Sequence, residues 1–303
     1  PTTVTVPGAN NYSVYFDGTG DYLLTPVNAG FDMGTGDFTV ECFVINNGYS
    51  GSQYGRGIFT IYTSGSYTNR LMVRLSSGDN AINIYTNSGS AGTYFGTSGT
   101  NGTTQLSNSR QWYHIALVRQ SGVFKLYING VQDIIISNQT SVSLPSSSVI
   151  EIGRNQDGSI PDWNGYISNF RVVKGTAVYT TTFSPPTDPL TAIANTSLLT
   201  AQANTIIDNS SNALTITTNG NAGPARNGPF ANTTTVTLVG NEGSAYFDGS
   251  GDCLGAESSN GILPADFTVE MWVYLTSSIA NQPLVAFGTE VSGRFSLLTN
   301  ASG

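Results

Sequence analysis

The carboxylates and amides of two short loops are the residues best suited to bind a metal ion. The segment RNQDGS places Asn155, Gln156 and Asp157 on a turn after a strand-like run. The segment DGTGD places Asp17 and Asp21 on either side of two glycines. Oxygen ligands of this kind suit Ca²⁺, which takes about six to eight of them. A polar turn explains either loop equally well, because glycine and asparagine accept left-handed backbone angles.

Acidic residues and the single histidine are the candidates for catalysis. Glycoside hydrolysis needs a general acid and a second carboxylate flanking the same bond. Glu41 and Glu270 each stand alone in matching strand-like runs, and Glu151 is isolated in another. A Ser-His-Asp site would have to use His114, which lies in the run WYHIALVR. We predict no catalytic residues, with Glu41 facing solvent on a strand and His114 in a structural role.

Three tyrosines lie in loops whose composition suits recognition of sugars. Tyr49 and Tyr54 lie in NNGYSGSQYGRG, and Tyr94 lies in NSGSAGTYFGTSG. Aromatic rings stack on sugar faces, and loops rich in Tyr, Ser, Gly and Asn make adaptable recognition surfaces. We predict ligand contacts at these three tyrosines, with ordinary packing as the alternative for each ring.

The composition favours strands and argues against several classes of partner. Charged residues make up only 10% of the 303 residues, and the formal net charge is −8. The polar surface must therefore come from Ser, Thr, Asn and Gly, which suit turns and disfavour helix interiors. The 11 basic residues are scattered, so no nucleic-acid surface is expected. No apolar run approaches the roughly 20 residues of a spanning helix, so membrane insertion is not expected.

Short runs rich in β-branched and aromatic residues predict an all-β fold. The strongest of these runs are 38–45, 112–119, 123–128, 148–153 and 166–173. In VFKLYI, the alternation predicts that Phe124, Leu126 and Ile128 face a core. Asn129 and Gly130 then supply a type I′ hairpin turn. Strands spaced by roughly 8–12 residues are typical of a two-sheet sandwich.

Three segments occur twice in the same order, which predicts a tandem repeat. YFDGTGDYL recurs as YFDGSGDCL, DFTVECFV as DFTVEMWV, and TTVTV as TTVTL, each about 230 residues later. The predicted domains are a first sandwich (1–190), a linker plus strands (191–240) and an incomplete second sandwich (241–303). Strands within 196–220 either close the first copy or open the second, and the proline-rich segment before them favours the second. The incomplete copy is expected to pair with 196–240, with another chain, or with sequence beyond Gly303.

Taken in order, these motifs resemble a laminin G-like domain of the concanavalin A-like lectin/glucanase superfamily. The motifs are YFDGTGDYL, DFTVECFV, WYHIALVRQSGVFKLYINGV, IEIGR and NGYISNFRVVKG. The resemblance implies two antiparallel sheets packed face to face as a jelly roll. Glucanases of this superfamily carry neighbouring carboxylates on one strand, a pattern that the chain lacks. The phrase GYISNFRVVKGTAVYTTTFSPPT is also similar to tandem laminin G-like repeats in structural proteins of marine tailed phages.

The resemblance also implies a place for calcium. Pentraxins, which share the fold, use a Glu-Gln-Asp triplet after a similar strand, and Asn155, Gln156 and Asp157 match that place with Asn instead of Glu. Pentraxins also use an Asp-Asn pair before a strand. In YTNRLMV, Asn69 matches the Asn and Thr68 replaces the Asp. The chain therefore lacks two of the carboxylates that pentraxins use, and a plain polar turn remains the alternative.

These observations predict a protein without enzymatic activity. It is expected to be a structural fibre or decoration protein of a phage-like virion, able to bind cell-surface glycans. The alternative is an extracellular carbohydrate-binding or adhesion module of a cellular protein. Expected partners are further copies, other virion proteins and glycans, at a virion surface or outside the cell. No cofactor is required, and Ca²⁺ is the one that the loops allow. The loop in GTGDYLLTPVNAGFDMGTGDF differs from that in GSGDCLGAESSNGILPADF, which favours recognition over a spacer role.

Overall fold

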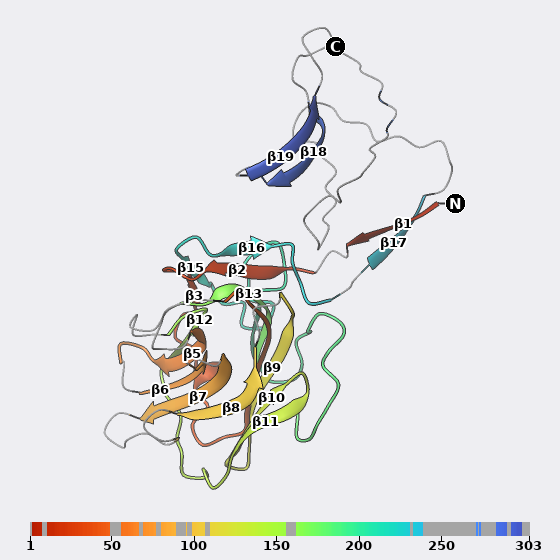
Figure 1. Cartoon of the computed structure of the whole chain (residues 1–303). Helices are drawn as coiled ribbons and strands as arrows, with labels where there is room; N and C mark the ends of the chain where they lie inside the picture. The colour runs from red at the N-terminus through yellow and green to blue at the C-terminus, as the bar shows by residue number, and fades with distance from the viewer. Residues whose placement is uncertain are drawn as a thin grey trace. The chain divides into compact units, whose positions relative to one another are not determined.

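The chain divides into two compact units, residues 2–237 and residues 238–303, which are described separately. The structure is a computed structural model (Figure 1). It describes residues 2–7, 11–48, 56–66, 69–76, 80–88, 95, 99–106, 110–155, 162–230, 233–238, 271, 273, 283–289 and 292–298. No helix within these residues is both long enough and apolar enough to cross a membrane.

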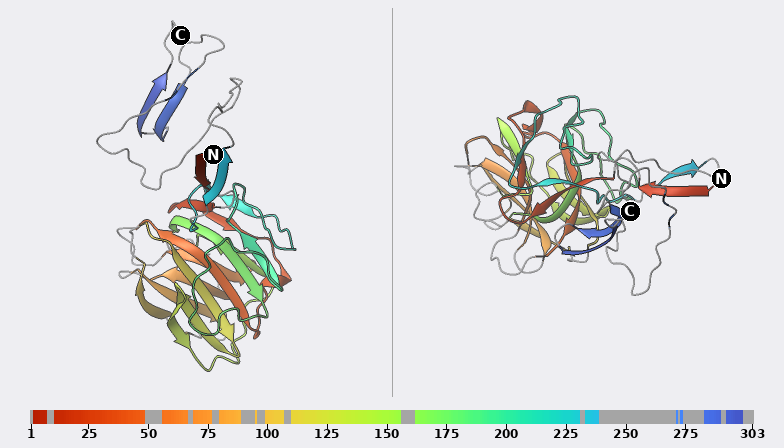
Figure 2. Two further views of the ribbon diagram at one scale, coloured as in Figure 1. Left: turned by 90° about the vertical axis from the view of Figure 1, so that its right-hand side faces the viewer. Right: turned by 90° about the horizontal axis from the view of Figure 1, so that it is seen from above.

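Two antiparallel sheets form the first unit (Figures 1 and 2). The eight-stranded sheet has the order β11-β10-β9-β4-β13-β2-β16, with β14 also paired to β13. Its strands are β2 (Ser13–Asp17), β4 (Phe38–Asn46), β9 (Tyr113–Gln120), β10 (Val123–Ile128), β11 (Val131–Ile136), β13 (Asn164–Lys174), β14 (Thr196–Thr200) and β16 (Gly223–Ala225).

The seven-stranded sheet has the order β15-β3-β12-β5-β6-β7-β8. Its strands are β3 (Tyr22–Leu24), β5 (Gly57–Thr63), β6 (Asn69–Leu75), β7 (Ala81–Ser88), β8 (Thr100–Gln105), β12 (Ser148–Ile152) and β15 (Thr217–Asn219). A 3₁₀ helix, η1 (Ala29–Phe31), follows β3 in the chain, and β1 (Thr2–Pro7) pairs with β17 (Thr233–Leu238) in a separate two-stranded sheet. The predicted all-β jelly-roll sandwich is confirmed.

The core lies between the two sheets and is filled by alternate side chains of their strands. The prediction for β10 is confirmed, because Phe124, Leu126 and Ile128 all belong to the buried core. Phe59 of β5 meets Phe170 of β13 edge to face across the layers, with ring centroids 5.4 Å apart. Each fully buried side chain of this size contributes about 1.5–3 kcal/mol to stability.

The turn between β10 and β11 has the backbone angles that its sequence predicts. Asn129 and Gly130 have φ values of 49° and 77°. Both are left-handed, as a type I′ turn requires. β11 then returns along β10 with Ile128 opposite Val131. Asp133 of β11 reaches the other sheet, because its Oδ1 accepts hydrogen bonds from the backbone N–H groups of residues 103 and 104 in β8.

Strands β14, β15 and β16, which follow residue 190, belong to the first unit in this structure. β2 pairs with residues 164–167 of β13, whereas β14 pairs with residues 170–173. β15 and β16 extend the edges of the two sheets, next to β3 and β2. This pairing differs from the expectation that residues 196–220 open the second copy. The physical reason is that the later half of β13 offers backbone hydrogen-bonding groups that β14 fills.

The described strands of the second unit form one hairpin. β18 (Pro283–Thr289) and β19 (Ser292–Leu298) pair in antiparallel fashion. The repeated motifs at 246–254 and most of 266–273 lie outside the described residues. The tandem repeat and the boundaries 1–190, 191–240 and 241–303 therefore stay predictions.

Candidate functional site

The face of the seven-stranded sheet that points away from the core carries polar and aromatic side chains. On β6, Leu71, Val73 and Leu75 enter the core. Successive side chains of a strand point to opposite faces of the sheet. Arg70 and Arg74 therefore lie on the outer face. Strands β6, β7 and β8, orange to yellow in Figure 1, lie side by side in the sheet.

The antiparallel register places the outward residues of β6, β7 and β8 in contact. Arg74 is opposite Asn83 of β7, which is opposite Asn101 of β8. The Nε of Arg74 donates a hydrogen bond to Oδ1 of Asn83 (2.9 Å), and Nδ2 of Asn83 donates to Oδ1 of Asn101 (2.6 Å). Arg70 and Arg74 each place the guanidinium carbon 5.5 Å from the centre of the Tyr85 ring. We call these five residues the β6–β8 surface.

The β6–β8 surface is accessible at its outer end. Asn101 is exposed, and Arg70, Arg74 and Tyr85 are half-buried, whereas Asn83 is buried beneath them. The surface thus offers guanidinium and amide donors, amide acceptors and one aromatic ring in a fixed arrangement. Groups of this kind recognise polar ligands that carry both apolar faces and hydroxyl or anionic groups.

Toward the middle of the same outer face, the side chains are buried. Tyr62 of β5 donates a hydrogen bond from its hydroxyl to Oε1 of Glu151 in β12 (3.0 Å). The exposed fractions of Tyr62 and Glu151 are 9% and 5%. This buried middle separates the β6–β8 surface from the other edge of the face, where Leu24 of β3 is half-buried and Thr217 of β15 is exposed.

The carboxylates of the turn at 17–21 accept backbone hydrogen bonds. Asp21 Oδ2 accepts from the N–H of Asp17 (2.8 Å), and Asp17 Oδ1 accepts from the N–H of Thr19 (2.7 Å). Asp162 Oδ2 accepts from the N–H of Gly20 (2.6 Å). Gly18 and Gly20 both have positive φ, as the turn alternative requires. No group of three His, Cys, Asp or Glu residues in the described parts of the chain is placed to hold a metal ion.

The carboxylate of Asp162 is affected by burial and by the two other carboxylates at this turn. Burial raises the pKa of Asp162, and the charges of Asp21 and Asp17 raise it further. The hydrogen bond from Gly20 and the charge of Arg154 act in the opposite direction but do not cancel these effects. The turn is thus a closely packed acidic corner in which hydrogen bonds from the chain itself hold the carboxylates.

If hydrogen bonding alone explains this corner, substitution of Asp21 should weaken the fold without any dependence on calcium. Asp21 is fully buried. The Asp21→Ala variant leaves the N–H groups of Asp17 and Asn221 without an acceptor. We expect it to lower the free energy of unfolding by about 1–3 kcal/mol. Thermal melts in Ca²⁺ and in chelator should coincide for the wild type. A calcium-dependent stabilisation that disappears in Asp21→Ala would instead establish a metal site.

The other predicted site residues are only partly described. Asn155 is fully buried, and its Oδ1 lies 3.4 Å from the hydroxyl oxygen of Thr60, which donates to it. The remaining predicted residues lie outside the described residues: the side chain of Asn69, and Gln156, Asp157, Tyr49, Tyr54 and Tyr94. Calcium binding therefore stays a prediction for Asn69, Asn155, Gln156 and Asp157. Ligand contact likewise stays a prediction for Tyr49, Tyr54 and Tyr94.

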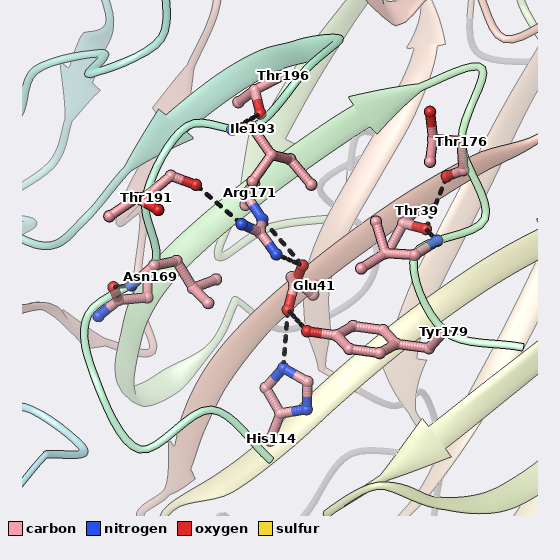
Figure 3. Close-up of polar contacts among 12 residues, drawn as sticks. Thr39, Glu41, His114, Asn169, Arg171, Thr176, Tyr179, Thr191, Ile193 and Thr196 are labelled. Atoms are coloured by element: carbon pink, nitrogen blue, oxygen red, sulfur yellow. Dashed lines mark hydrogen bonds and ion pairs between the residues drawn. The ribbon is translucent and has the colours of Figure 1, made fainter. Parts of the chain in front are cut away.

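A second polar cluster is enclosed on the outer side of the eight-stranded sheet (Figure 3). Glu41 of β4 accepts two hydrogen bonds from Arg171 of β13, through Nε (2.9 Å) and Nη2 (2.6 Å). Its other oxygen accepts from the hydroxyl of Tyr179 (2.8 Å) and lies 3.0 Å from Nε2 of His114. An ionised carboxylate has no proton to donate, so Nε2 of His114 carries the proton in this contact.

Glu41 does not face solvent, and that prediction is wrong. Its side chain is buried along with that of His114. The segment that follows β13 covers both, because Tyr179 donates to Glu41 and the rings of Tyr179 and Phe183 lie edge to face on His114. These two rings also stack on each other, with centroids 3.7 Å apart. The Phe183 ring also packs edge to face on Tyr127 of β10. The cluster therefore fastens residues 175–195 to the sheet, and His114 has the structural role that its strand position suggests.

The surroundings of Glu41 and Tyr179 shift their pKa values in opposite directions. Burial alone would raise the pKa of Glu41, but the hydrogen bond from His114 and the charge of Arg171 outweigh it and lower the pKa below its ordinary value. Burial raises the pKa of Tyr179, and the neighbouring charge of Glu41 raises it further. Glu41 is therefore held as an anion and Tyr179 as a neutral hydrogen-bond donor.

The two packed antiparallel sheets and the polar outer face define a lectin-type sandwich. A laminin G family model, described as the concanavalin A-like lectin/glucanases superfamily, matches residues 17–181, more than half of the chain. The chain belongs to the concanavalin A-like lectin/glucanases superfamily, as the sequence motifs indicated. No curated protein sequence matches the chain at a significant level.

Several solved structures are similar to the chain. A Bacteroides ovatus protein assigned as carbohydrate-binding has 15% identity and a TM-score of 0.47, with 72% of this chain and 60% of that chain covered. The heptameric SAP-like pentraxin of Limulus polyphemus has 15% identity and a TM-score of 0.42, with 70% and 95% covered. Domain 4 of the Geobacillus stearothermophilus arabinanase AbnA, solved with arabinotriose, has 17% identity and a TM-score of 0.40, with 59% and 78% covered. The chain thus spans three fifths of the length of the Bacteroides protein.

Proposed function

We propose that the protein is a carbohydrate-binding and adhesion module whose glycan site is the β6–β8 surface. The observation that carries the proposal is the hydrogen-bonded row Arg74–Asn83–Asn101 beside the Tyr85 ring. Sugars present hydroxyl groups that both donate and accept hydrogen bonds, and this row offers donors and acceptors to them. The row is held by its own hydrogen bonds, so little side-chain freedom is lost when a ligand binds. Membership of a lectin and glucanase superfamily is in keeping with this assignment.

The placement of the two described glutamates, Glu41 and Glu151, supports binding without hydrolysis. Hydrolysis of a glycosidic bond uses two carboxyl groups that flank the same bond. Glu41 lies on the outer side of the eight-stranded sheet, and Glu151 lies on the outer side of the seven-stranded sheet. Both are buried. They face away from each other across the whole sandwich, so a non-enzymatic role fits their placement.

We further propose that the module is one of a tandem series in an extracellular or particle-surface protein, with a fibre or decoration protein of a phage-like virion as the specific candidate. The repeat of YFDGTGDYL and DFTVECFV along the chain favours an arrayed role. The partners would then be further copies, other virion proteins and glycans on a cell surface. Gold-labelled antibodies against the chain should decorate particle surfaces or fibres in electron micrographs. Labelling confined to the cell interior would contradict the arrayed role.

A glycan array probed with the full chain tests the binding function. We expect the wild type to bind a limited set of glycans, and Asn101→Ala to reduce that binding about tenfold, because the variant removes an exposed amide at the end of the row. Gln132→Ala is the matched control, since Gln132 is an exposed amide residue on β11 of the other sheet. Tyr85→Ala should also lose binding. Absence of any bound glycan, or equal losses in Asn101→Ala and Gln132→Ala, would refute the assignment.

A further inference from the structure

Aromatic side chains form a row across the outer face of the eight-stranded sheet. Phe16 of β2 belongs to the core, so the neighbouring Tyr15 points outward. Ile167 of β13 belongs to the core as well, so Tyr166 also points outward. The register places Tyr15 directly opposite Tyr166, and the two ring centroids are 5.1 Å apart. The row therefore crosses from strand to strand and does not run along a single strand.

Trp112, just before β9, continues this row past β4. Its ring centroid is 6.4 Å from that of Tyr166. On β4, Ile45 lies opposite Tyr166 and is only 3% exposed. Strands β9, β4, β13 and β2 are successive neighbours in the sheet, and at about 4.8 Å between strands the row is roughly 14 Å long. We call Tyr15, Tyr166 and Trp112 the aromatic row.

The aromatic row is accessible, although the residues beside it are covered. All three of its side chains are half-buried. Phe43, the previous outward residue of β4, is 5% exposed, and the Phe230 ring packs edge to face on it at 5.1 Å. At the β16 end, Gly223 lies opposite Tyr15. Among the described residues, a Cβ on Gly223 would contact the backbone oxygen of Asn221 at 3.7 Å, so this end of the row has open space beside it.

Polar groups border the other side of the aromatic row. Asp17 and Asn164 lie opposite each other, two residues from the tyrosines on β2 and β13, and so on the same outer face. Nδ2 of Asn164 donates to the carbonyl of Gly48 (3.2 Å), and the exposed Asn47 donates its N–H to the carbonyl of Asn164 (3.0 Å). Amide and carboxylate groups exchange hydrogen bonds with hydroxyl groups. The sheet thus presents an apolar strip with a hydrogen-bonding border.

The shape of this strip suits a chain of sugars better than a folded protein. Outward residues of one strand follow each other at about 7 Å, so the strip is roughly 14 Å long and about 7 Å wide. A stable protein interface buries about 800 Å² per partner, which is many times the area of the strip. A pyranose ring with equatorial substituents has C–H groups on its faces and hydroxyl groups around its edge. Its faces can therefore stack on aromatic rings while its edge bonds to the border.

We propose that the aromatic row binds a neutral polysaccharide of flat, equatorially linked pyranose units. The three rings would stack on consecutive sugars, because the row is longer than one pyranose ring. Asn164 and Asp17 would bind the hydroxyl groups, and the Asp17 carboxylate would repel an acidic chain. This second site goes beyond the proposed function of the β6–β8 surface. The two sites lie on opposite faces of the sandwich, so one module could hold two glycan chains.

Affinity electrophoresis of the full chain, in gels that contain a polysaccharide, tests the proposal. Hydroxyethylcellulose and xylan provide flat, equatorially linked chains, and dextran provides a flexible chain with a different linkage. We expect at least one of the two flat polymers to slow the migration of the wild type, and dextran to have no effect. Equal slowing by dextran, or no slowing by any of the three, would overturn the proposal.

Variants of the rings assign the binding to the aromatic row. Trp112→Ala and Tyr166→Ala should each weaken binding to the flat polymer about tenfold, because each removes one stacking ring. Tyr15→Phe should bind like the wild type, since its ring remains. Tyr22→Ala is the matched control, because Tyr22 is a half-buried tyrosine of the other sheet, beneath the guanidinium group of Arg154. Melting curves show whether each variant is folded, and Trp112→Leu replaces Trp112→Ala if the latter is not.

The failure of this site can be distinguished from that of the proposed function. Asn101→Ala should leave binding of the flat polymer unchanged. Loss of that binding in Asn101→Ala, with full binding in Trp112→Ala and Tyr166→Ala, would assign the polymer to the β6–β8 surface and overturn the second site. A wild-type dimer that Trp112→Ala dissociates in sedimentation, without any polysaccharide binding, would show that the row is a protein contact and would also overturn it.

Discussion

Replacement of Glu41 by alanine is expected to lower the free energy of unfolding by about 3–5 kcal/mol. The change removes the acceptor for both bonds from Arg171 and for the Tyr179 hydroxyl. It leaves a guanidinium group that is only 6% exposed without its counter-ion. An uncompensated buried charge costs more than the pair contributes when intact. Because Tyr179 belongs to the covering segment, residues 175–195 should loosen before the rest of the sandwich unfolds.

Urea unfolding followed by tryptophan fluorescence measures this effect. Hydrogen exchange of backbone amides in residues 175–195 tests the local loosening. Asp188→Ala is the control, because Asp188 is an exposed carboxylate in the same segment. Its loss should change stability by less than about 0.5 kcal/mol. A Glu41→Ala variant as stable as Asp188→Ala would show that the buried cluster contributes little.

The same cluster predicts a dependence on pH. The folded protein holds the pKa of Glu41 below its ordinary value of 4.5. The unfolded chain therefore binds the proton first, and the contribution of Glu41 to stability is fully present above its unfolded pKa. It is lost as the pH falls through the lower, folded pKa. The difference in stability between the wild type and Glu41→Gln should accordingly be constant near neutral pH and shrink below pH 4.5.

Replacement of Gly130 by alanine is expected to destabilise the protein by roughly 2–5 kcal/mol in total. Gly130 has a φ of 77°, a conformation that costs an L-residue roughly 1–2 kcal/mol. A Cβ at this position would also overlap the carbonyl oxygen of Phe183. The Gly130 carbonyl accepts a hydrogen bond from the N–H of Phe183 (3.1 Å), so the overlap would push the covering segment away from the β10–β11 turn.

A second glycine separates the two causes. Gly65 has nearly the same φ, 76°, but a Cβ there would meet nothing within 4 Å. Gly65→Ala should therefore cost only the backbone strain, and the difference between the two variants measures the contact with Phe183. Denaturation midpoints of both variants provide the comparison. Equal losses would mean that the covering segment moves aside without cost.

The strands and their turns could be predicted from sequence because their signals are local. The alternation in VFKLYI and the Asn129-Gly130 pair define a hairpin within 14 residues, and the structure confirms it. The order of such motifs was enough to identify the superfamily. These features depend on the pleat of one strand and the backbone preferences of single residues.

The burial of Glu41 could not be predicted in this way. The alternation of β4 correctly places Glu41 on the face opposite Cys42, which is in the core. That face is covered by a segment more than 130 residues later, and the segment has no strand or helix periodicity. Its contact with the sheet depends on the Tyr179 and Phe183 rings. A strand pattern shows which side a residue faces and does not show what lies on that side.

The β6–β8 surface was missed for a related reason. NRLMVRL alternates clearly enough to place Arg70 and Arg74 on one face. Their contact with Tyr85 depends on the register between β6 and β7, and a shift of one residue would place Tyr85 on the other face. The loop between these strands, SSGDN, predicts a turn, but a loop of this length does not by itself fix the register. The tyrosines chosen from loop composition, Tyr49, Tyr54 and Tyr94, stay predictions.

The chain comes into the sandwich and leaves it at one edge. Ser13 of β2 lies opposite Ala225 of β16, and the N–H of Phe230 donates to the side chain of Asn11 (3.1 Å). A pull applied to the two flanking segments would separate the paired residues of β2 and β16 one after another, beginning with Ser13 and Ala225. It would not shear the core. The same geometry suits insertion of the whole module into a surface loop of another protein, where close ends are required.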